Sequence, residues 1–218
     1  MFKIETLLAS TLIFLASCVG NTTPETDTNT ETGDSNTEKV AENCTYSFNK
    51  DSTTVAWTAF KTTEKIGVDG KFDTVNISGT KEADNIAGVF SEASFSIPVS
   101  SINTNNPDRD MKIQKFFFGK LVGAETLSGK LKSLGNDGKG VVTVSMNGVE
   151  KDVEMDFTQN GDEVTLAAII DVGEWNAQAG VKALNDECYE LHMAGDGVSK
   201  LWPDVKISIT SLLNKSCE

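Results

Sequence analysis

Apolar and polar residues alternate with a period of two in the central part of the chain. Over residues 149–157 the acids Glu150, Asp152, Glu154 and Asp156 occupy every second position, between Val149, Lys151, Val153, Met155 and Phe157. Successive side chains of a β-strand point to opposite faces of the sheet. The pattern therefore predicts a strand with one wet face and one dry face.

Turn signals bound this strand on both sides. Asn147-Gly148 precedes it, and Asn-Gly suits a type I′ hairpin turn because both central residues of that turn need positive φ. Asn136-Asp137-Gly138 and Asn160-Gly161-Asp162 separate the neighbouring runs. We predict four antiparallel strands in a meander, over about 127–134, 140–146, 149–157 and 163–171.

The flanking sequence predicts further strands that could close this meander into a barrel. They are expected over 53–61, over about 70–79 after a turn through Gly67 and Gly70, over 91–102, and over about 205–211. Pro98 cannot donate a backbone hydrogen bond, so it suggests an edge or a bulge. A long meander must leave its edges open or close into a barrel, and we expect closure.

Two short helices are predicted outside the strands. The first covers about 107–116, with Asn106 as its cap and Pro107 at its first position. The second covers about 177–185, with Asn176 as its cap. The three residues Phe116, Phe117 and Phe118 follow the first helix, and they favour a plug at one end of the barrel over a ligand contact, although both roles are compatible.

The amino terminus predicts export and anchoring. Residues 7–16 are mostly apolar but too few for a permanent membrane helix. Leu15-Ala16-Ser17-Cys18 resembles a bacterial lipobox, so we expect residues 1–17 to be a lipoprotein signal peptide and Cys18 to be lipidated. An ordinary secretory signal is the alternative. The expected location is the bacterial outer membrane, on its periplasmic or cell-surface side.

Composition separates a tether from a folded domain. Residues 18–43 are rich in Thr and acids and poor in apolar residues, which predicts a disordered tether. Residues 44–218 form one predicted domain. The whole chain has a net charge of −13. The tether has six acids and one lysine, and Lys3 and Glu5 cancel, so the domain has a net charge of −8. This balance argues against nucleic acid as a partner. The composition does not decide whether the domain forms a homodimer.

Three cysteines remain in the domain, Cys44, Cys188 and Cys217. Cys44 precedes the first strand and Cys217 follows the last, and in a closed meander those strands pair antiparallel. We predict a Cys44–Cys217 disulfide with Cys188 left over. The alternative pairs Cys188 with one of the other two, and a non-reducing peptide map distinguishes them.

The dry faces of the predicted strands, together with neighbouring aromatic residues, give the candidate lining of a ligand tunnel. These residues are Val55, Trp57, Ala59, Phe72, Phe95, Ile97, Phe116, Phe117, Val142, Val144, Val153, Met155, Leu166, Ala168 and Trp175. A small barrel either holds one ligand or is filled by its own side chains. The two hypotheses are a lipid carrier with an apolar tunnel and a filled barrel that acts through its acidic surface.

Catalytic and metal chemistry find little support. His192 is the only histidine, and we expect it to be a surface residue. No catalytic residue, metal site or cofactor is predicted from these residues. Arg109-Asp110 is interpreted as a buried ion pair that fixes the first helix to the barrel rim, in preference to the alternative of a contact with a ligand head group.

Several segments in a fixed order carry a family resemblance. They are Val55-Ala56-Trp57, the run SINTNNPDRDMKIQKFFF from Ser101 to Phe118, LSGKL, NGVEKDVEMDF and LWPDVKISI. Together they resemble the YceI-like family of exported bacterial proteins over roughly residues 46–213. The resemblance implies an eight-stranded, lipocalin-like antiparallel barrel that binds a polyisoprenoid or similar amphiphile. It therefore implies no cofactor other than a bound polyisoprenoid or quinone-like lipid. The stretch 176–200 departs from the family's pattern.

Overall fold

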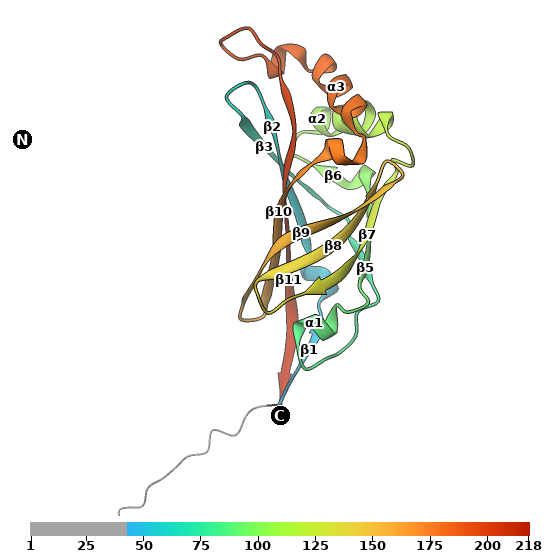
Figure 1. The fold of residues 1–218 in the computed structure, drawn as a ribbon, viewed down its shortest axis with the longest axis vertical. Coiled ribbons are helices and arrows are strands. Elements are labelled where there is room, and N and C mark those ends of the chain that lie inside the picture. The colour runs from blue at the N-terminus through green and yellow to red at the C-terminus, as the bar shows by residue number, and fades with distance from the viewer. Residues whose placement is uncertain (1–42) are drawn as a thin grey trace, which may run out of the picture. The chain divides into compact units, whose positions relative to one another are not determined.

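The computed structural model describes residues 43–218, which belong to one compact unit. Within that range the strand segments form one antiparallel sheet (Figure 1). The segments are β1 (Cys44–Phe48), β2 (Thr54–Lys61), β3 (Ile66–Phe72), β4 (Asn76–Ser78), β5 (Ser94–Pro98), β6 (Ile102–Asn103), β7 (Thr126–Leu134), β8 (Lys139–Met146), β9 (Val149–Asn160), β10 (Glu163–Asp171) and β11 (Leu201–Cys217). The α-helices are α1 (Ile86–Val89), α2 (Pro107–Lys112) and α3 (Gln178–Glu187). None of these helices has the length and apolar character needed to cross a bilayer.

The sheet closes on itself through strands that are interrupted and then resume. β3 pairs with β6 and β4 pairs with β5, so the path 66–78 runs antiparallel to the path 94–103. β1 and β2 likewise pair in succession with the long strand β11. The described residues thus contain eleven segments instead of the eight predicted strands, because three strand paths are each split in two. The predicted all-β antiparallel barrel is confirmed.

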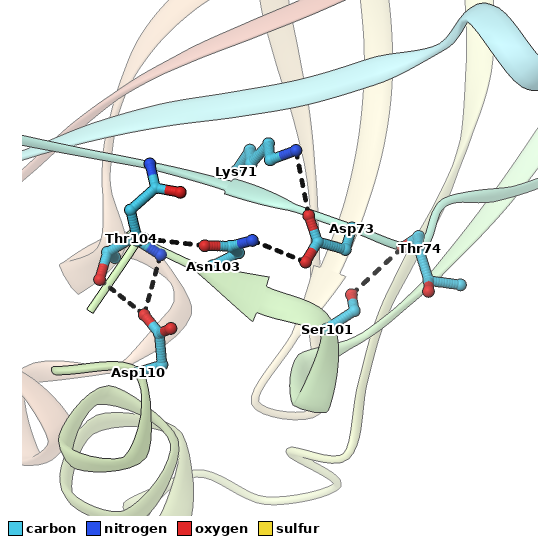
Figure 2. A network of polar contacts seen from close by, with 8 residues as sticks. Lys71, Asp73, Thr74, Ser101, Asn103, Thr104 and Asp110 are labelled. Carbon is cyan, nitrogen blue, oxygen red and sulfur yellow. Dashed lines mark hydrogen bonds and ion pairs between the residues drawn. The ribbon is translucent and has the colours of Figure 1, made fainter. Parts of the chain in front are cut away.

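A polar network holds the seam where two of these paths change register (Figure 2). The path through β5 and β6 is interrupted at a 3-10 turn, Val99–Ser101, directly after Pro98, which agrees with the predicted irregularity. Asn103 Nδ2 donates to Asp73 Oδ2 over 2.7 Å, and Lys71 Nζ lies 3.1 Å from Asp73 Oδ1. The hydrogen bond from Asn103, followed by the contact with Lys71, lowers the pKa of Asp73. The seam therefore keeps a charged carboxylate at its centre.

The predicted meander is confirmed as β7 to β10, with the register set by the turns. Asn147 and Gly148 have φ values of 54° and 69°, as a type I′ turn requires. The four acids of β9 are exposed, and three of them pair with lysines of β7 and β8: Asp152 pairs with Lys132, whereas Glu154 and Asp156 pair with Lys139. The alternation therefore predicted the correct outer face.

Four local predictions need correction. The turn after β2 falls at residues 62–65, where Thr62 and Lys65 have positive φ, so β3 begins before Gly67 and Gly70. Helix α1 was not predicted, and β11 is longer than the expected 205–211 at both ends. Asn176 does not cap α3: its φ of 58° places it in the left-handed region, and it ends the 3-10 turn Val172–Trp175. Asn106 does cap α2, since its Oδ1 accepts from the Arg109 backbone N–H.

The two ends of the barrel differ. At one end α2 and α3 lie together, while α1 and β1 lie at the opposite end (Figure 1). β1 pairs with the end of β11, which brings Cys44 opposite Cys217. The predicted Cys44–Cys217 disulfide is confirmed, and Cys188 is buried and forms no disulfide within residues 43–218.

We predict that reducing the disulfide lowers the free energy of unfolding by about 2–5 kcal/mol. The crosslink joins cysteines 173 residues apart and so restricts most of the unfolded chain. Urea unfolding of the unit 43–218 with and without a reducing agent measures the change. The variant Cys44→Ser is the control, because reductant should not shift its midpoint. Equal midpoints for the unsubstituted protein in both conditions would contradict the prediction.

Candidate functional site

The barrel encloses an apolar cavity of about 240 Å³. Its wall comes from the inner faces of the strands, and its roof comes from α3 and from the π-helical turn Ile113–Phe117 that continues α2. The lining contains no titratable side chain. The space therefore suits a hydrocarbon group and offers no acid, base or nucleophile for chemistry.

Most of the residues that the alternation assigned to the interior do line this cavity. They are Val55, Trp57, Ala59, Phe72, Phe95, Ile97, Phe117, Val142, Val144, Val153 and Met155. Each comes from a strand whose inner face the pattern identified, except Phe117, which comes from the π-helical turn. Their role as ligand contacts stays a prediction.

Four predicted lining residues lie elsewhere. Phe116 is not part of the cavity lining, and Lys115 Nζ lies 5.0 Å from its ring centroid. Leu166 lines a separate small cavity. Ala168 pairs with Ile207, a lining residue, but its short side chain does not reach the cavity. Trp175 is core: it is 1% exposed, and its Nε1 donates to the Val144 carbonyl over 3.0 Å.

The sequence reasoning missed many of the lining residues. They are Val75, Ile77, Ile102, Ile113, Phe118, Leu127, Met146, Ile170, Val172, Val181, Leu184, Leu201, Trp202, Val205, Ile207 and Ile209. Alternation along the last strand already marked Val205, Ile207 and Ile209 as one face. Val181 and Leu184 share one face of the predicted second helix. Ile102 and Val75 carry no such signal, because they lie at interrupted strands.

Two further cavities adjoin the apolar one. A larger cavity of about 470 Å³ lies between β2, α2 and the segment after α3, and we call it the mouth. The residues that line both it and the apolar cavity are Trp57, Ala59, Ile113, Leu184 and Leu201. A small cavity of about 90 Å³ shares Ile77, Phe95, Val142 and Ile209 with the apolar cavity. The lining of the central cavity is thus apolar, the small cavity adds the polar side chains of Thr53, Ser94 and Ser211, and charged side chains line only the mouth.

The helices over the mouth are fastened to the barrel and to each other. Asp110 Oδ1 accepts from the backbone N–H of Thr104, over 2.9 Å, and from its hydroxyl, over 2.6 Å (Figure 2). Lys112 Nζ lies 3.5 Å from Glu187 Oε1 and so links α2 to α3. The predicted Arg109–Asp110 ion pair is wrong for the described residues, because Asp110 alone fixes the helix to the rim while Arg109 faces the mouth.

Trp57 stands where the mouth meets the apolar cavity. It pairs with Gly70 across β2 and β3, and a Cβ atom at position 70 would come within 2.2 Å of its Cζ2. Glycine is therefore needed for the indole to lie over β3. Trp175 and Trp202 donate their Nε1–H groups to the carbonyls of Val144 and Thr62. In the described part of the chain, Trp57 Nε1 is buried without a hydrogen-bond partner.

His192 is buried at the mouth, which corrects the expectation that it lies on the surface. Its Nδ1–H donates to Asn185 Oδ1 over 2.9 Å and connects α3 to the following turn. Burial, followed by the positive charges of Lys61 and Lys112, lowers the pKa of His192 to about 4. The imidazole is therefore neutral near pH 7. No group of three His, Cys, Asp or Glu side chains placed to hold a metal ion occurs within residues 43–218.

Comparisons with known proteins identify the fold. The family model of the YceI-like domain matches residues 46–211. A polyisoprenoid-binding domain from Saccharophagus degradans, implicated in plant cell wall breakdown, is 12% identical, with a TM-score of 0.54 over 82% of this chain and 100% of its own. BcnA from Burkholderia cenocepacia is 13% identical, with a TM-score of 0.52 over 78% of this chain and 99% of its own. A search of curated proteins found no match. At these identities the two structures show a shared lipocalin-like fold.

We predict that acid destabilises the unit partly through His192. The pKa of His192 is about 4 in the folded protein, below the usual value near 6.5. The unfolded chain therefore binds the proton more tightly, and stability present above pH 6.5 is lost as the pH falls towards 4. The expected contribution is on the order of 1–2 kcal/mol.

The measurement is urea unfolding between pH 7 and 4 for the unsubstituted unit and for His192→Gln. Carboxylates titrate in both proteins, so the difference between their slopes isolates the histidine. Parallel slopes would show that His192 does not carry this dependence.

Proposed function

This chain belongs to the YceI-like family, and we propose that it is a binding protein, not an enzyme, that holds a long apolar lipid inside its barrel. The observation that carries the proposal is the apolar cavity that opens into the mouth. The ligand class is a polyisoprenoid or a similar long-chain lipid. The polyisoprenoid-binding domain from Saccharophagus degradans, which has the same fold, supports this class.

The size of the cavity favours a ligand over a filled barrel. Sites for small molecules usually measure about 300–1,000 Å³. The apolar cavity alone, at about 240 Å³, falls just below this range. It continues into the mouth of about 470 Å³ through five shared residues, so the joined space is large enough. A barrel filled by its own side chains, the alternative function, would not leave this space.

Binding of a lipid chain inside the barrel needs no charged side chain, because burial of the chain supplies the free energy. Each buried methylene contributes about 0.8 kcal/mol, so a prenyl chain can bind through burial alone. Ordering the flexible chain offsets part of this gain. An entirely apolar lining is therefore what a carrier of such a chain requires.

The proposal includes a membrane anchor. The predicted signal peptide, Cys18 and the tether up to residue 42 lie outside the described residues, and the proposal for them rests on the lipobox-like Leu15-Ala16-Ser17-Cys18. A cysteine with more than one acyl chain holds a protein stably on a membrane. The tethered barrel would then take up, store or sequester a lipid beside the bacterial outer membrane.

We predict that Ala168→Trp abolishes lipid uptake without unfolding the barrel. Ala168 lies on the inner face opposite Ile207, so an indole there enters the apolar cavity. The control is Ala167→Trp, because Ala167 pairs with Asp156 and Ser208 and faces outward. Native mass spectrometry of the unit 43–218 from a bacterial host should show an adduct on the unsubstituted and control proteins only.

Circular dichroism checks that both variants are folded. An adduct that persists on folded Ala168→Trp would place the ligand outside the apolar cavity. An unsubstituted protein that carries no adduct, and gains none when prenyl quinones are added, would refute the binding function itself.

We also predict that Cys18→Ser abolishes incorporation of labelled palmitate and releases the protein from the membrane fraction. The reason is that a serine hydroxyl cannot replace the thiol that accepts the first lipid. Labelling of cells that express the full chain measures the result, with Cys188→Ser as the control. A variant that still incorporates palmitate would contradict the anchor.

A further inference from the structure

We propose that the mouth is a subsite for the anionic head group of the bound lipid. The ligand is then a single-chain amphiphile, with its chain in the apolar cavity and a phosphate or carboxylate at the mouth. This inference rests on the proposed function, because a head group at the mouth requires a chain in the barrel.

Positive side chains gather at the mouth of an otherwise acidic domain. Lys61, Arg109 and Lys112 line it, whereas Asp108 is the only acid in the lining. Glu187 balances part of the charge of Lys112, at 3.5 Å. The excess of cations is local, because residues 44–218 as a whole have a net charge of −8. An anion is thus repelled by most of the surface and attracted at this opening.

The three cations border the same part of the mouth, where Lys61 and Lys112 are half-buried and Arg109 is exposed. Lys61 donates to the Leu191 carbonyl over 2.8 Å, which holds its charge beside the mouth. Cys188 and His192 form the floor. Burial raises the pKa of the Cys188 thiol, and the positive charges of Lys112, Lys61 and Arg109 oppose that rise. Burial, followed by the charges of Lys61 and Lys112, lowers the pKa of His192. Both directions agree with the placement of these cations in the same lining.

Trp57 gives a second, independent indication that a polar atom of the ligand lies where the mouth meets the apolar cavity. Its side chain lines both the mouth and the apolar cavity, and it is 8% exposed. Its Nε1–H has no partner among the described residues. Buried donors nearly always have an acceptor. The oxygen atom that joins the lipid chain to its head group would lie at the junction of the two cavities, where it can accept a hydrogen bond from Trp57 Nε1–H.

The test compares two probes with the same C20 prenyl chain, geranylgeranyl phosphate and geranylgeraniol. Binding to the unit 43–218 is measured by the change in tryptophan emission, since Trp57 and Trp202 line the cavity. We expect the phosphate to bind about tenfold more tightly than the alcohol at low salt, and the difference to shrink as salt screens the charges.

The variant Arg109→Gln/Lys112→Gln should remove this preference, because it weakens binding of the phosphate far more than binding of the alcohol. The matched control is Lys115→Gln/Lys120→Gln, which removes the same charge from the same segment at residues that do not line the mouth. The control should keep the preference. Thermal unfolding verifies that both variants are folded.

The outcomes separate the two proposals. Equal binding of both probes, or a preference that survives Arg109→Gln/Lys112→Gln, overturns the head-group subsite while the binding function stands. No binding of either probe overturns the binding function. Inorganic phosphate in excess should compete only weakly, because it has no chain; full displacement by phosphate would mean that the mouth is a site for free anions.

Discussion

Closure of the antiparallel sheet is the constraint on which the rest of the structure depends. An open sheet of this length would expose unpaired backbone groups at both edges. Here the path through β3 and β4 meets the path through β5 and β6, and the register change between them is bridged by Asp73, Asn103 and Lys71. The interruptions allow the strands to bend without losing their partners. The closing strand pairs are thus accompanied by a small polar network outside the apolar interior.

A closed sheet with an apolar inner face creates a ligand space when its side chains do not fill the centre. Glycines and small residues contribute to this. Gly70 leaves room for the Trp57 indole to lie against β3, and Ala59 and Ala168 are short inward-facing residues. The helices α2 and α3 then cover one end instead of the middle, so the apolar cavity remains connected to the mouth.

The segment after β10 forms part of the apolar wall and part of the mouth of this barrel. The Asn147 side chain of the hairpin turn donates to the carbonyls of Trp175 and Asn176, which fixes the start of α3 beside the barrel. Helix α3 brings Val181 and Leu184 to the apolar cavity, and the turn after it brings His192 to the mouth. One segment thus completes the apolar wall and builds the polar opening. Family membership and the shared fold account for the barrel, whereas this segment shapes its entrance.

The sequence by itself determined the local structure, because strand alternation, Asn-Gly turns and cap residues act over a few neighbouring positions. It identified the meander from β7 to β10, the inner face that contains Val142 and Met155, and the pairing of Cys44 with Cys217, and its resemblance to the YceI-like family was correct. Only the tertiary structure decided which inward residues border empty space. Trp175 and Trp57 have equal hydrophobic character in the sequence, yet one is packed core and the other borders both cavities. Likewise, the mouth is lined by Lys61, Arg109 and His192, which lie far apart in the chain. A short-range sequence pattern cannot predict that such distant residues come together.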